Sequence, residues 1–475
     1  MKSLEIENLN GALVSVVGAA RSGVAAVAAL AELGAIVTLS DSKPESDLAV
    51  IAHEVRAAGT RCVFGGSTED ALPAETALVI TSPGVPVTAD VLVAAVERGI
   101  PVWSEIELAY RITAAPILAV TGTNGKTTTA LLLAAMLQEG GRRATVCGNV
   151  SADEIKKTLV EAAREADPAS DILVAEISSF QLEWVERFAP RVAILTNITA
   201  DHLNRHRSFE EYAGTKARIF AAQGENDWAV VGCDNPASRE IGERPGLARR
   251  VWFTTEGPPP DDGPCAWVDQ GTLTIRLGAR ESEVAIMNAS DMPATLPGAH
   301  SVANVLAAAT AALAMDVPAE AIARAVKGFG GVAHRMEWVG DVNGVRFVNN
   351  SMCTNVAAAI CSLEAMDRPT IVIAGGADKG LDFEPLAPAL HRKARHLILI
   401  GAAVGKMEAA FRSCGYGAIS RETSLEAAVT SAAEMARPGE AVLLSPSCAS
   451  FDMFRDFEAR GAAFRTAVRQ LEERL

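Results

Sequence analysis

The chain lacks any apolar run long enough to cross a membrane, and it lacks an excess of positive charge. Its longest nearly uncharged stretch, residues 299–315, is interrupted by His300, Asn304 and Thr310, so it predicts a buried helix. Lysine and arginine number 43 against 58 acidic residues, which gives a net charge of −15. Such a surface repels polyanions and excludes general nucleic-acid binding. A phosphorylated ligand must therefore be held by local backbone N–H groups and single lysines.

Paired cysteines and an export signal are also missing. The eight cysteines form no Cys-x-x-Cys pair and no His/Cys spacing typical of a zinc site. The first seven residues contain no apolar segment of a secretory signal. We therefore expect reduced cysteines that lie mostly in the core and a cytoplasmic location. No membrane partner and a monomer are further expectations. With 49% hydrophobic and 21% charged residues, the chain has a globular composition.

Short apolar runs alternate with helical patterns along the whole chain. This alternation is typical of parallel sheets whose strands are connected by helices, so the predicted fold class is α/β. The predicted strands are residues 11–18, 36–39, 78–81, 117–120, 172–177, 192–196, 345–348, 370–374, 396–400 and 441–445, and the clearest helices are residues 19–33 and 127–138.

The rhythm of these elements is interrupted twice, which predicts three domains. Their expected ranges are residues 1–113, 114–331 and 332–475. The proline-rich segment 258–264 predicts an exposed turn inside the second domain. Gly328-Phe329-Gly330-Gly331 precedes the third domain, and a glycine-rich joint in that place predicts a hinge.

The strongest motif lies between a predicted strand and a predicted helix and reads Thr121-Gly122-Thr123-Asn124-Gly125-Lys126-Thr127-Thr128. Its glycines allow successive N–H groups to converge on phosphate oxygens, and the helix start adds its positive dipole end. Lys126 can reach the β- and γ-phosphates, and the Thr127 hydroxyl can ligate Mg²⁺. Val120 replaces the first glycine of the usual phosphate loop. The motif predicts ATP or GTP binding but not the reaction.

A weaker glycine loop follows the first predicted strand and reads Gly18-Ala19-Ala20-Arg21-Ser22-Gly23. Asp41 ends the next strand, as in dinucleotide-binding folds, but Ala20 replaces the middle glycine of that fingerprint. Two interpretations stay open: NAD binding, or a packing turn of a Rossmann-like domain. Ser82 follows the strand 78–81 and is placed to complete the rim of the same pocket.

An acidic residue and a histidine follow two strands of the second domain. Glu176 lies at the end of the strand 172–177, and His202 lies just past the strand 192–196. Ligands of doubly wound sheets gather beyond the carboxyl ends of the strands, so both residues are expected beside the phosphate loop. Glu176 suits Mg²⁺ as a ligand. Spacing alone nevertheless favours a solvated carboxylate and a structural histidine.

Together these residues resemble the Mur ligase family, the ATP-dependent amide-bond ligases of peptidoglycan precursor synthesis. The resemblance runs the full length of the chain. It rests on residues 122–128, 176–181, 197–202, 296–300 with Asn304, His334-Arg335, Gly375-Gly376 with Lys379, and 445–452. Within the family, the runs Ser-Ser-Phe-Gln-Leu-Glu and Ser-Pro-Ser-Cys-Ala-Ser look like those of members that add glutamate to UDP-N-acetylmuramoyl-L-alanine.

The resemblance implies ATP and Mg²⁺ as cofactors and an acyl-phosphate route with release of ADP and phosphate. The residues implied as catalytic are Lys126, Glu176, His202, Lys216 and His334. Thr127, Glu176, His202 and Lys216 would hold metal. Lys216 matches a position where family members carry a carbamylated lysine, whereas an unmodified lone lysine is by default solvated on the surface.

The resemblance also assigns the ligands to the three domains: UDP to an N-terminal Rossmann-like domain, ATP to a central P-loop domain with a mostly parallel sheet, and the amino acid to a C-terminal Rossmann-like domain. The implied ATP contacts are Gly122, Thr123, Asn124, Gly125, Lys126, Thr127, Thr128, Asn304, Arg335 and Asn350. The implied substrate contacts are Gly18, Ser42, Lys43 and Ser82 for UDP, Asn149 and Gln181 for the muramoyl part, and Thr354, Lys379, Ser450 and Phe457 for glutamate.

Two residues depart from the family pattern near the expected amino-acid site. Asn350 stands where members that add D-glutamate usually have aspartate, and Met352 stands where they have lysine. D-glutamate is the first expectation and L-glutamate the alternative. A folate-polyglutamate-type ligase and an NAD-dependent oxidoreductase are more distant alternatives.

Overall fold

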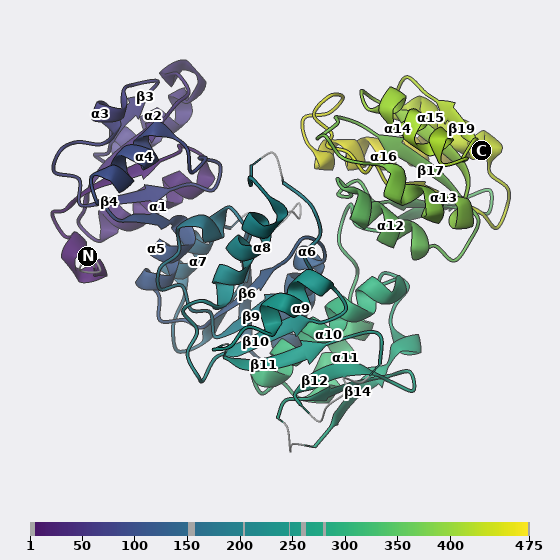
Figure 1. Ribbon diagram of the computed structural model, residues 1–475, viewed down its shortest axis with the longest axis horizontal. Coiled ribbons are helices and arrows are strands. Elements are labelled where there is room, and N and C mark those ends of the chain that lie inside the picture. Colours follow the sequence, from purple (N-terminus) through teal and green to yellow (C-terminus); the bar gives the residue numbers. More distant parts are fainter. Residues whose placement is uncertain are drawn as a thin grey trace. The chain divides into compact units, whose positions relative to one another are not determined.

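The computed structural model describes residues 5–150, 157–202, 205–246, 248–257, 263–278 and 282–473. It contains three sheets, which belong to two compact units (Figure 1). The first unit comprises Met1–Asn288 and Val305–Ala325, and the second comprises Ala289–Asn304 and Val326–Leu475. The first two sheets lie in the first unit and the third sheet in the second.

The first sheet is parallel and has the strand order β3-β2-β1-β4-β5. The order reverses between β1 and β4, so the carboxyl ends of these two strands form the place where a ligand is expected. Its elements are β1 (Leu13–Val17), α1 (Arg21–Glu32), β2 (Ile36–Asp41), α2 (Ala49–Ala57), β3 (Arg61–Phe64), α3 (Thr68–Ala71), β4 (Leu78–Thr81), α4 (Asp90–Glu97), β5 (Val102–Ser104) and α5 (Glu105–Ile112).

The second sheet has nine strands in the order β14-β13-β12-β11-β10-β9-β6-β8-β7, and only the β12-β13-β14 end is antiparallel. Its strands are β6 (Ile117–Thr121), β7 (Arg143–Gly148), β8 (Asp171–Glu176), β9 (Val192–Leu195), β10 (Trp228–Gly232), β11 (Arg249–Phe253), β12 (Cys265–Asp269), β13 (Thr272–Arg276) and β14 (Val284–Asn288). The helices of this part are α6 (Lys126–Glu139), α7 (Leu159–Glu165), α8 (Phe209–Ala217), α9 (Pro236–Gly242), α10 (Gly298–Ala314) and α11 (Ala319–Lys327).

The third sheet has the order β15-β16-β20-β17-β18-β19, with β15 antiparallel to the rest. Val372 and Ile373 of β17 belong to different apolar clusters, so both faces of the sheet are covered. Its elements are β15 (Glu337–Val342), β16 (Val345–Asn349), α12 (Val356–Glu364), β17 (Thr370–Gly375), α13 (Ala387–Lys393), β18 (Ala394–Ile400), α14 (Val404–Ser413), β19 (Ile419–Arg421), α15 (Leu425–Met435), β20 (Ala441–Leu444) and α16 (Phe457–Glu473). Short 3₁₀ turns are η1 (Ile6–Leu9), η2 (Glu45–Asp47), η3 (Gln181–Trp184), η4 (Arg218–Phe220), η5 (Ala289–Asp291) and η6 (Glu384–Leu386).

The structure confirms the α/β fold class and every strand predicted from the apolar runs. The apolar stretch 299–315 is the buried helix α10, and no helix among the described residues is long and apolar enough to span a bilayer. The boundaries at 113 and 331, and the hinge at 328–331, stay predictions. Residues 258–262 of the proline-rich segment lie outside the described residues. Half of the eight cysteines are buried, fewer than expected.

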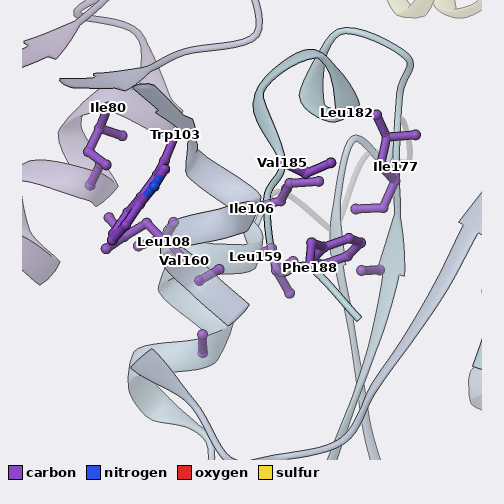
Figure 2. Packing of buried hydrophobic residues seen from close by; sticks show 14 of the residues in the cluster. Ile80, Trp103, Ile106, Leu108, Leu159, Val160, Ile177, Leu182, Val185 and Phe188 are labelled. Atoms are coloured by element: carbon purple, nitrogen blue, oxygen red, sulfur yellow. The ribbon is translucent and has the colours of Figure 1, made fainter. Parts of the chain in front are cut away.

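One apolar cluster joins the first and second sheets. Trp103, Ile106 and Leu108, at the end of β5 and in α5, belong to the same cluster as Leu159 of α7 and Phe188 (Figure 2). Glu107 is buried within this region, and its carboxylate accepts hydrogen bonds from the backbone N–H groups of residues 186, 187 and 188 and from Arg111 Nε. The cluster and this carboxylate therefore hold α5 against the second sheet.

Candidate active site

The phosphate loop connects β6 to α6 and is shaped by the segment that follows β9. The N–H groups of Thr123 and Asn124 donate to the carbonyl and side-chain oxygens of Asn197, and Thr196 Oγ1 donates to the Asn124 carbonyl (2.7 Å). A Cβ atom on Gly122 would lie 1.9 Å from Thr196 Oγ1, so only glycine fits there. Because Gly125 is the N-cap of α6, no side-chain cap occupies the helix start. The uncapped start of α6 suits a bound phosphate. The N–H groups of Thr123 and Asn124, expected at the phosphate, instead donate to Asn197.

Glu176 is buried, and it is paired with the first turn of α6. Thr127 Oγ1 donates to its Oε2 (2.7 Å), and Asn149 Nδ2 donates to its Oε1 (3.4 Å). Only 3% of Glu176 is exposed, so the solvated carboxylate favoured by spacing alone is wrong. The reason is that three strand ends, those of β6, β7 and β8, converge here. The structure thus brings together Thr127, Asn149 and Glu176.

Lys216 is fully buried beneath the phosphate loop, and the solvated lysine expected by default is also wrong. Its Nζ donates to the Gly122 carbonyl (2.9 Å) and lies 4.8 Å from the centre of the Tyr212 ring. Burial, and next the charge of Lys126, hold the pKa of Lys216 well below its ordinary value, while Asp201 and Glu176 oppose the shift. A neutral amine is a nucleophile, so this environment suits modification of the amine.

His202 has a left-handed backbone (φ +54°), and its N–H donates to Asp201 Oδ1. Its ring lies edge-on to Phe180, 5.0 Å between centres. A second histidine, His206, stacks on the same phenylalanine, and its Nε2 is hydrogen-bonded to Ser179 Oγ (3.0 Å). Burial lowers the pKa of His206. The sequence analysis missed His206, although its spacing of four from His202 was a usable signal.

The donors present fit magnesium only together with a phosphate. Among the described residues no three His, Cys, Asp or Glu side chains gather to hold a metal alone. The Thr127 hydroxyl and the Glu176 carboxylate are nevertheless hard oxygen donors at the end of the phosphate loop. Mg²⁺ is commonly bound by one or two protein oxygens that are completed by substrate phosphates. The chemistry of this donor set therefore agrees with a nucleotide-bound Mg²⁺.

Gln181, expected at the muramoyl part, is held by a buried carboxylate that the sequence analysis missed. Gln181 Nε2 donates to Glu105 Oε1 (2.7 Å), and Gln181 Oε1 accepts from the N–H and hydroxyl of Ser178. Burial raises the pKa of Glu105 to about 7, against a lowering by the Gln181 hydrogen bond. Glu105 comes directly after β5, so only the packing of α5 on the second sheet brings it here.

This carboxylate is expected to make stability fall with rising pH. The ordinary pKa is 4.5 and the native one about 7, so the protonated form stabilises the fold fully below pH 4.5, and this contribution is lost as pH rises through 7. The variant Glu105→Gln stays uncharged at every pH. Its free energy of unfolding should be higher than that of the wild type by up to about 3 kcal/mol at pH 8, and the two should be equal near pH 4.5. Urea unfolding at a series of pH values measures this.

The control for Glu105→Gln is Glu97→Gln, at an exposed position of α4. It should leave the pH profile of unfolding unchanged. A profile of Glu105→Gln that runs parallel to the wild type would contradict the expected titration of Glu105.

The first sheet brings Gly18 and Ser82 together at the reversal of strand order. Ser82 Oγ donates to the Gly18 carbonyl (3.0 Å), and a Cβ on Gly18 would lie 2.8 Å from Ser82 Cβ. Asp41 accepts from the N–H groups of Ala19 (2.8 Å) and Lys43 (3.0 Å). Asp41 therefore holds the loop itself, while Ser42 and Lys43 beside it are exposed.

In the second unit, His334 is buried with a left-handed backbone (φ +61°). Asn349 Nδ2 lies 3.1 Å from His334 Nδ1, and the ring meets Phe457 edge-on at 6.2 Å. Next to it, Arg335 Nη2 lies 2.9 Å from the Met352 sulfur. One departure from the family pattern, Met352, therefore lies in direct contact with an expected ATP residue.

The remaining expected residues of this unit lie on separate segments. Asn350 is buried and accepts from the Met336 N–H (3.2 Å), and Asn304 is buried in α10. Ser450 is buried, Thr354 half-buried and Lys379 exposed. A backbone bond from Ala377 to Ala449 places the segment before Lys379 beside the segment of Ser450.

A buried arginine that the sequence analysis missed ties these segments together. Arg460 donates to the carbonyls of Ser351, Cys448 and Ala449. Since only 1% of its surface is exposed, it fixes the turn after β16 against the segment after β20.

Comparison with known proteins finds a Mur ligase domain model in each of three parts of the chain. Residues 12–104 match the model "Mur ligase MurD-like, N-terminal domain", 120–312 the "Mur ligase middle domain" and 334–448 the "Mur ligase, glutamate ligase domain". The UDP-N-acetylmuramoylalanine--D-glutamate ligase of Pelotomaculum thermopropionicum is 41% identical, over 97% of this chain and 98% of its own. That of Caldanaerobacter subterraneus is 39% identical, over 96% and 98%. The chain belongs to the Mur ligase family.

This Mur ligase is an ATP-dependent ligase built of three Mur ligase domains. Solved structures share its fold: the UDP-N-acetylmuramate-alanine ligase of Thermotoga maritima (TM-score 0.57, 17% identity, 98% and 100% of the two chains covered) and a pseudomurein peptide ligase type C of Methanothermus fervidus (0.57, 17%, 97% and 100%). Nothing supports the NAD-dependent oxidoreductase alternative. The Asp41 carboxylate already accepts hydrogen bonds from the N–H groups of Ala19 and Lys43.

Proposed function

We propose that this Mur ligase joins D-glutamate to UDP-N-acetylmuramoyl-L-alanine in the cytoplasm, with consumption of ATP and with Mg²⁺ as cofactor. The observation that carries the proposal is the phosphate loop with Glu176 and Lys216 buried against it. The D-glutamate ligases of related bacteria, 41% and 39% identical over almost their whole length, support this substrate pair. A monomer stays a prediction.

In this proposal the first step activates the substrate acid. A carboxylate oxygen of the L-alanyl group attacks the γ-phosphorus of ATP, the bond to ADP breaks, and an acyl phosphate forms. Lys126 and the start of α6 stabilise the charge on the transferred group. Thr127, Glu176, His202 and, once carbamylated, Lys216 are the proposed holders of Mg²⁺, which supplies further charge neutralisation when bound.

The second step forms the amide. The neutral amine of glutamate attacks the acyl carbon to give a tetrahedral intermediate; the bond from that carbon to the phosphate oxygen then breaks, and the nitrogen loses one proton to solvent. The proposed glutamate contacts are Thr354, Lys379, Ser450 and Phe457. The proposed UDP contacts are Gly18, Ser42, Lys43 and Ser82, and those to the muramoyl part are Asn149 and Gln181. Asn304, Arg335, Asn350 and His334 are assigned to the nucleotide side of the site.

Phosphate release tests the proposal directly. The purified enzyme is given ATP, Mg²⁺, UDP-N-acetylmuramoyl-L-alanine and one amino acid from a panel that includes both glutamates. We expect phosphate and ADP only when the nucleotide sugar and D-glutamate are both present. If phosphate is released with the nucleotide sugar and L-glutamate but not with D-glutamate, the alternative substrate is established. If neither glutamate causes release of phosphate, the proposal is refuted.

Met352 and Asn350 are expected to affect the choice of amino acid. Because Met352 contacts Arg335, a lysine there would place two cations side by side unless an aspartate is restored at 350. The double change Met352→Lys, Asn350→Asp should alter the ratio of kcat/KM for D- over L-glutamate by about threefold or more. Met352→Leu, which keeps the size and adds no charge, should leave the ratio unchanged. If the double variant and the wild type have the same ratio of kcat/KM for D- over L-glutamate, neither position affects the choice of amino acid.

A further inference from the structure

Arg205 connects the two sheets of the first unit at the proposed nucleotide-sugar site. Its guanidinium donates to three consecutive carbonyls of the turn after β4: Pro83 (3.3 Å), Gly84 (3.4 Å) and Val85 (2.7 Å). Arg205 itself lies in the second sheet's domain, between His202 and α8. A single side chain thus bridges the turn of the first sheet and the segment that follows His202 in the second.

The same turn carries Ser82, which meets Gly18 across the reversal of strand order. Val85 N–H donates to the Ser82 carbonyl, so residues 82–85 close into one turn, and Ser82 Oγ donates to the Gly18 carbonyl. Both residues are proposed UDP contacts. Arg205 therefore bonds to the backbone carbonyls of the turn that carries Ser82, and Ser82 in turn bonds to Gly18.

Arg205 is anchored on the second sheet's side by a carboxylate and an aromatic ring. Its Nη2 donates to Glu183 Oε2 (2.8 Å), and its guanidinium carbon lies 4.7 Å from the centre of the Phe180 ring. Phe180 also contacts the ring of His202 and directly precedes Gln181. The residue that holds the UDP turn is thus packed on residues that position the proposed muramoyl and metal contacts.

This pattern of bonds exceeds what an ion pair needs. Glu183 alone would balance the charge of Arg205. Both side chains are largely buried, with 15% of Arg205 and 9% of Glu183 exposed. The guanidinium also donates from Nη1 and Nη2 to a turn of another sheet, while its buried Nε has no hydrogen-bond partner among the described residues. Arginine suits this task because its planar, forked donors bind several acceptors at once, whereas lysine has one donor atom.

We propose that Arg205 is a positioning residue for the nucleotide sugar: it fixes the 82–85 turn so that the first domain binds UDP in register with Phe180, Gln181 and His202. The proposal rests on the proposed function, and it assigns to Arg205 the binding of one substrate only. Loss of the forked guanidinium should weaken the binding of the nucleotide sugar. The binding of ATP and of glutamate, which depends on other residues, should not change.

Kinetics of Arg205→Met and Arg205→Lys test this. We expect the KM for UDP-N-acetylmuramoyl-L-alanine to rise at least tenfold in Arg205→Met, with the KM for ATP and for glutamate within twofold of wild type. Arg205→Lys, which keeps the charge without the fork, should show a smaller rise. Arg207→Met is the matched control, because Arg207 is 90% exposed and pairs only with Glu211 among the described residues; its kinetic constants should not change.

Calorimetric titration with UDP alone separates this proposal from the proposed function. We expect wild type and Arg207→Met to bind UDP equally and Arg205→Met to bind it at least tenfold more weakly, at a similar unfolding temperature. Equal UDP binding by wild type and both Arg205 variants would overturn the role of Arg205 and leave the ligase proposal intact. Failure of the wild type to bind UDP would overturn both. If Arg205→Met does not fold, equal constants in Arg205→Lys and wild type would overturn the role.

Discussion

Lys126→Ala is expected to lower the rate of ligation about a hundredfold to a thousandfold while the protein stays folded. A cation placed on the transferred phosphoryl group stabilises charge that develops in the transition state, and removal of such a contact typically costs two to three orders of magnitude. In the structure, Lys126 Nζ donates to the Thr123 carbonyl (3.0 Å). Loss of that bond should change the free energy of unfolding by only about 1 kcal/mol. Phosphate release and urea unfolding measure the two effects.

Lys393→Ala is the control for this change. Lys393 donates to the Met366 carbonyl in the second unit, and it belongs to no proposed site. Its ligation rate should equal that of the wild type. Turnover of Lys126→Ala at the wild-type rate would contradict the assignment of the phosphate loop.

Glu107→Ala is expected to destabilise the first unit by about 3–5 kcal/mol, the largest effect on stability that we expect from a single change. The variant leaves the N–H groups of residues 186, 187 and 188 without their acceptor and leaves the charge of Arg111 largely buried. Arg111 lies 3.9 Å from the centre of the buried Trp103 ring. Urea unfolding of the variant and the wild type measures the difference in the free energy of unfolding.

Glu186→Ala tests the same network from its surface. Glu186 also pairs with Arg111, but 47% of its side chain is exposed. An exposed ion pair contributes little, so the change should cost less than about 1 kcal/mol. Equal stabilities of Glu107→Ala and Glu186→Ala would show that the buried carboxylate does not hold α5 in place.

The central strands were predictable because they are buried on both faces. Residues of β1, β4, β6, β8, β9, β17 and β20 read as continuous apolar runs, the pattern that a covered parallel sheet demands. The edge strands β3, β5, β7, β15 and β19 were not predicted, because short length or partial burial removes the continuous apolar run on which the prediction relied. The antiparallel end β12-β13-β14 and the interior strands β10 and β11 were also missed, although β10 is buried throughout.

The phosphate loop was predictable for a different reason. Its residues are contiguous, and a glycine turn before a helix start is set by local backbone geometry. The burial of Glu176 and Lys216 was not predictable, since each depends on strands and loops far away in the chain. Lys216 meets Gly122 across 94 positions, so no local pattern distinguishes it from a surface lysine.

The sequence by itself determined the α/β class, the order of the motifs and the place of the phosphate loop, because short-range sterics and apolar periodicity govern those features. Tertiary structure alone decided which polar side chains are buried and paired. Glu105 meets Gln181, Glu107 meets residues 186–188 and Arg205 meets the 82–85 turn only once α5 and β4 are packed on the second sheet. The low dielectric that shifts the pKa values of Glu105 and Lys216 is created by that packing and exists nowhere in the unfolded chain.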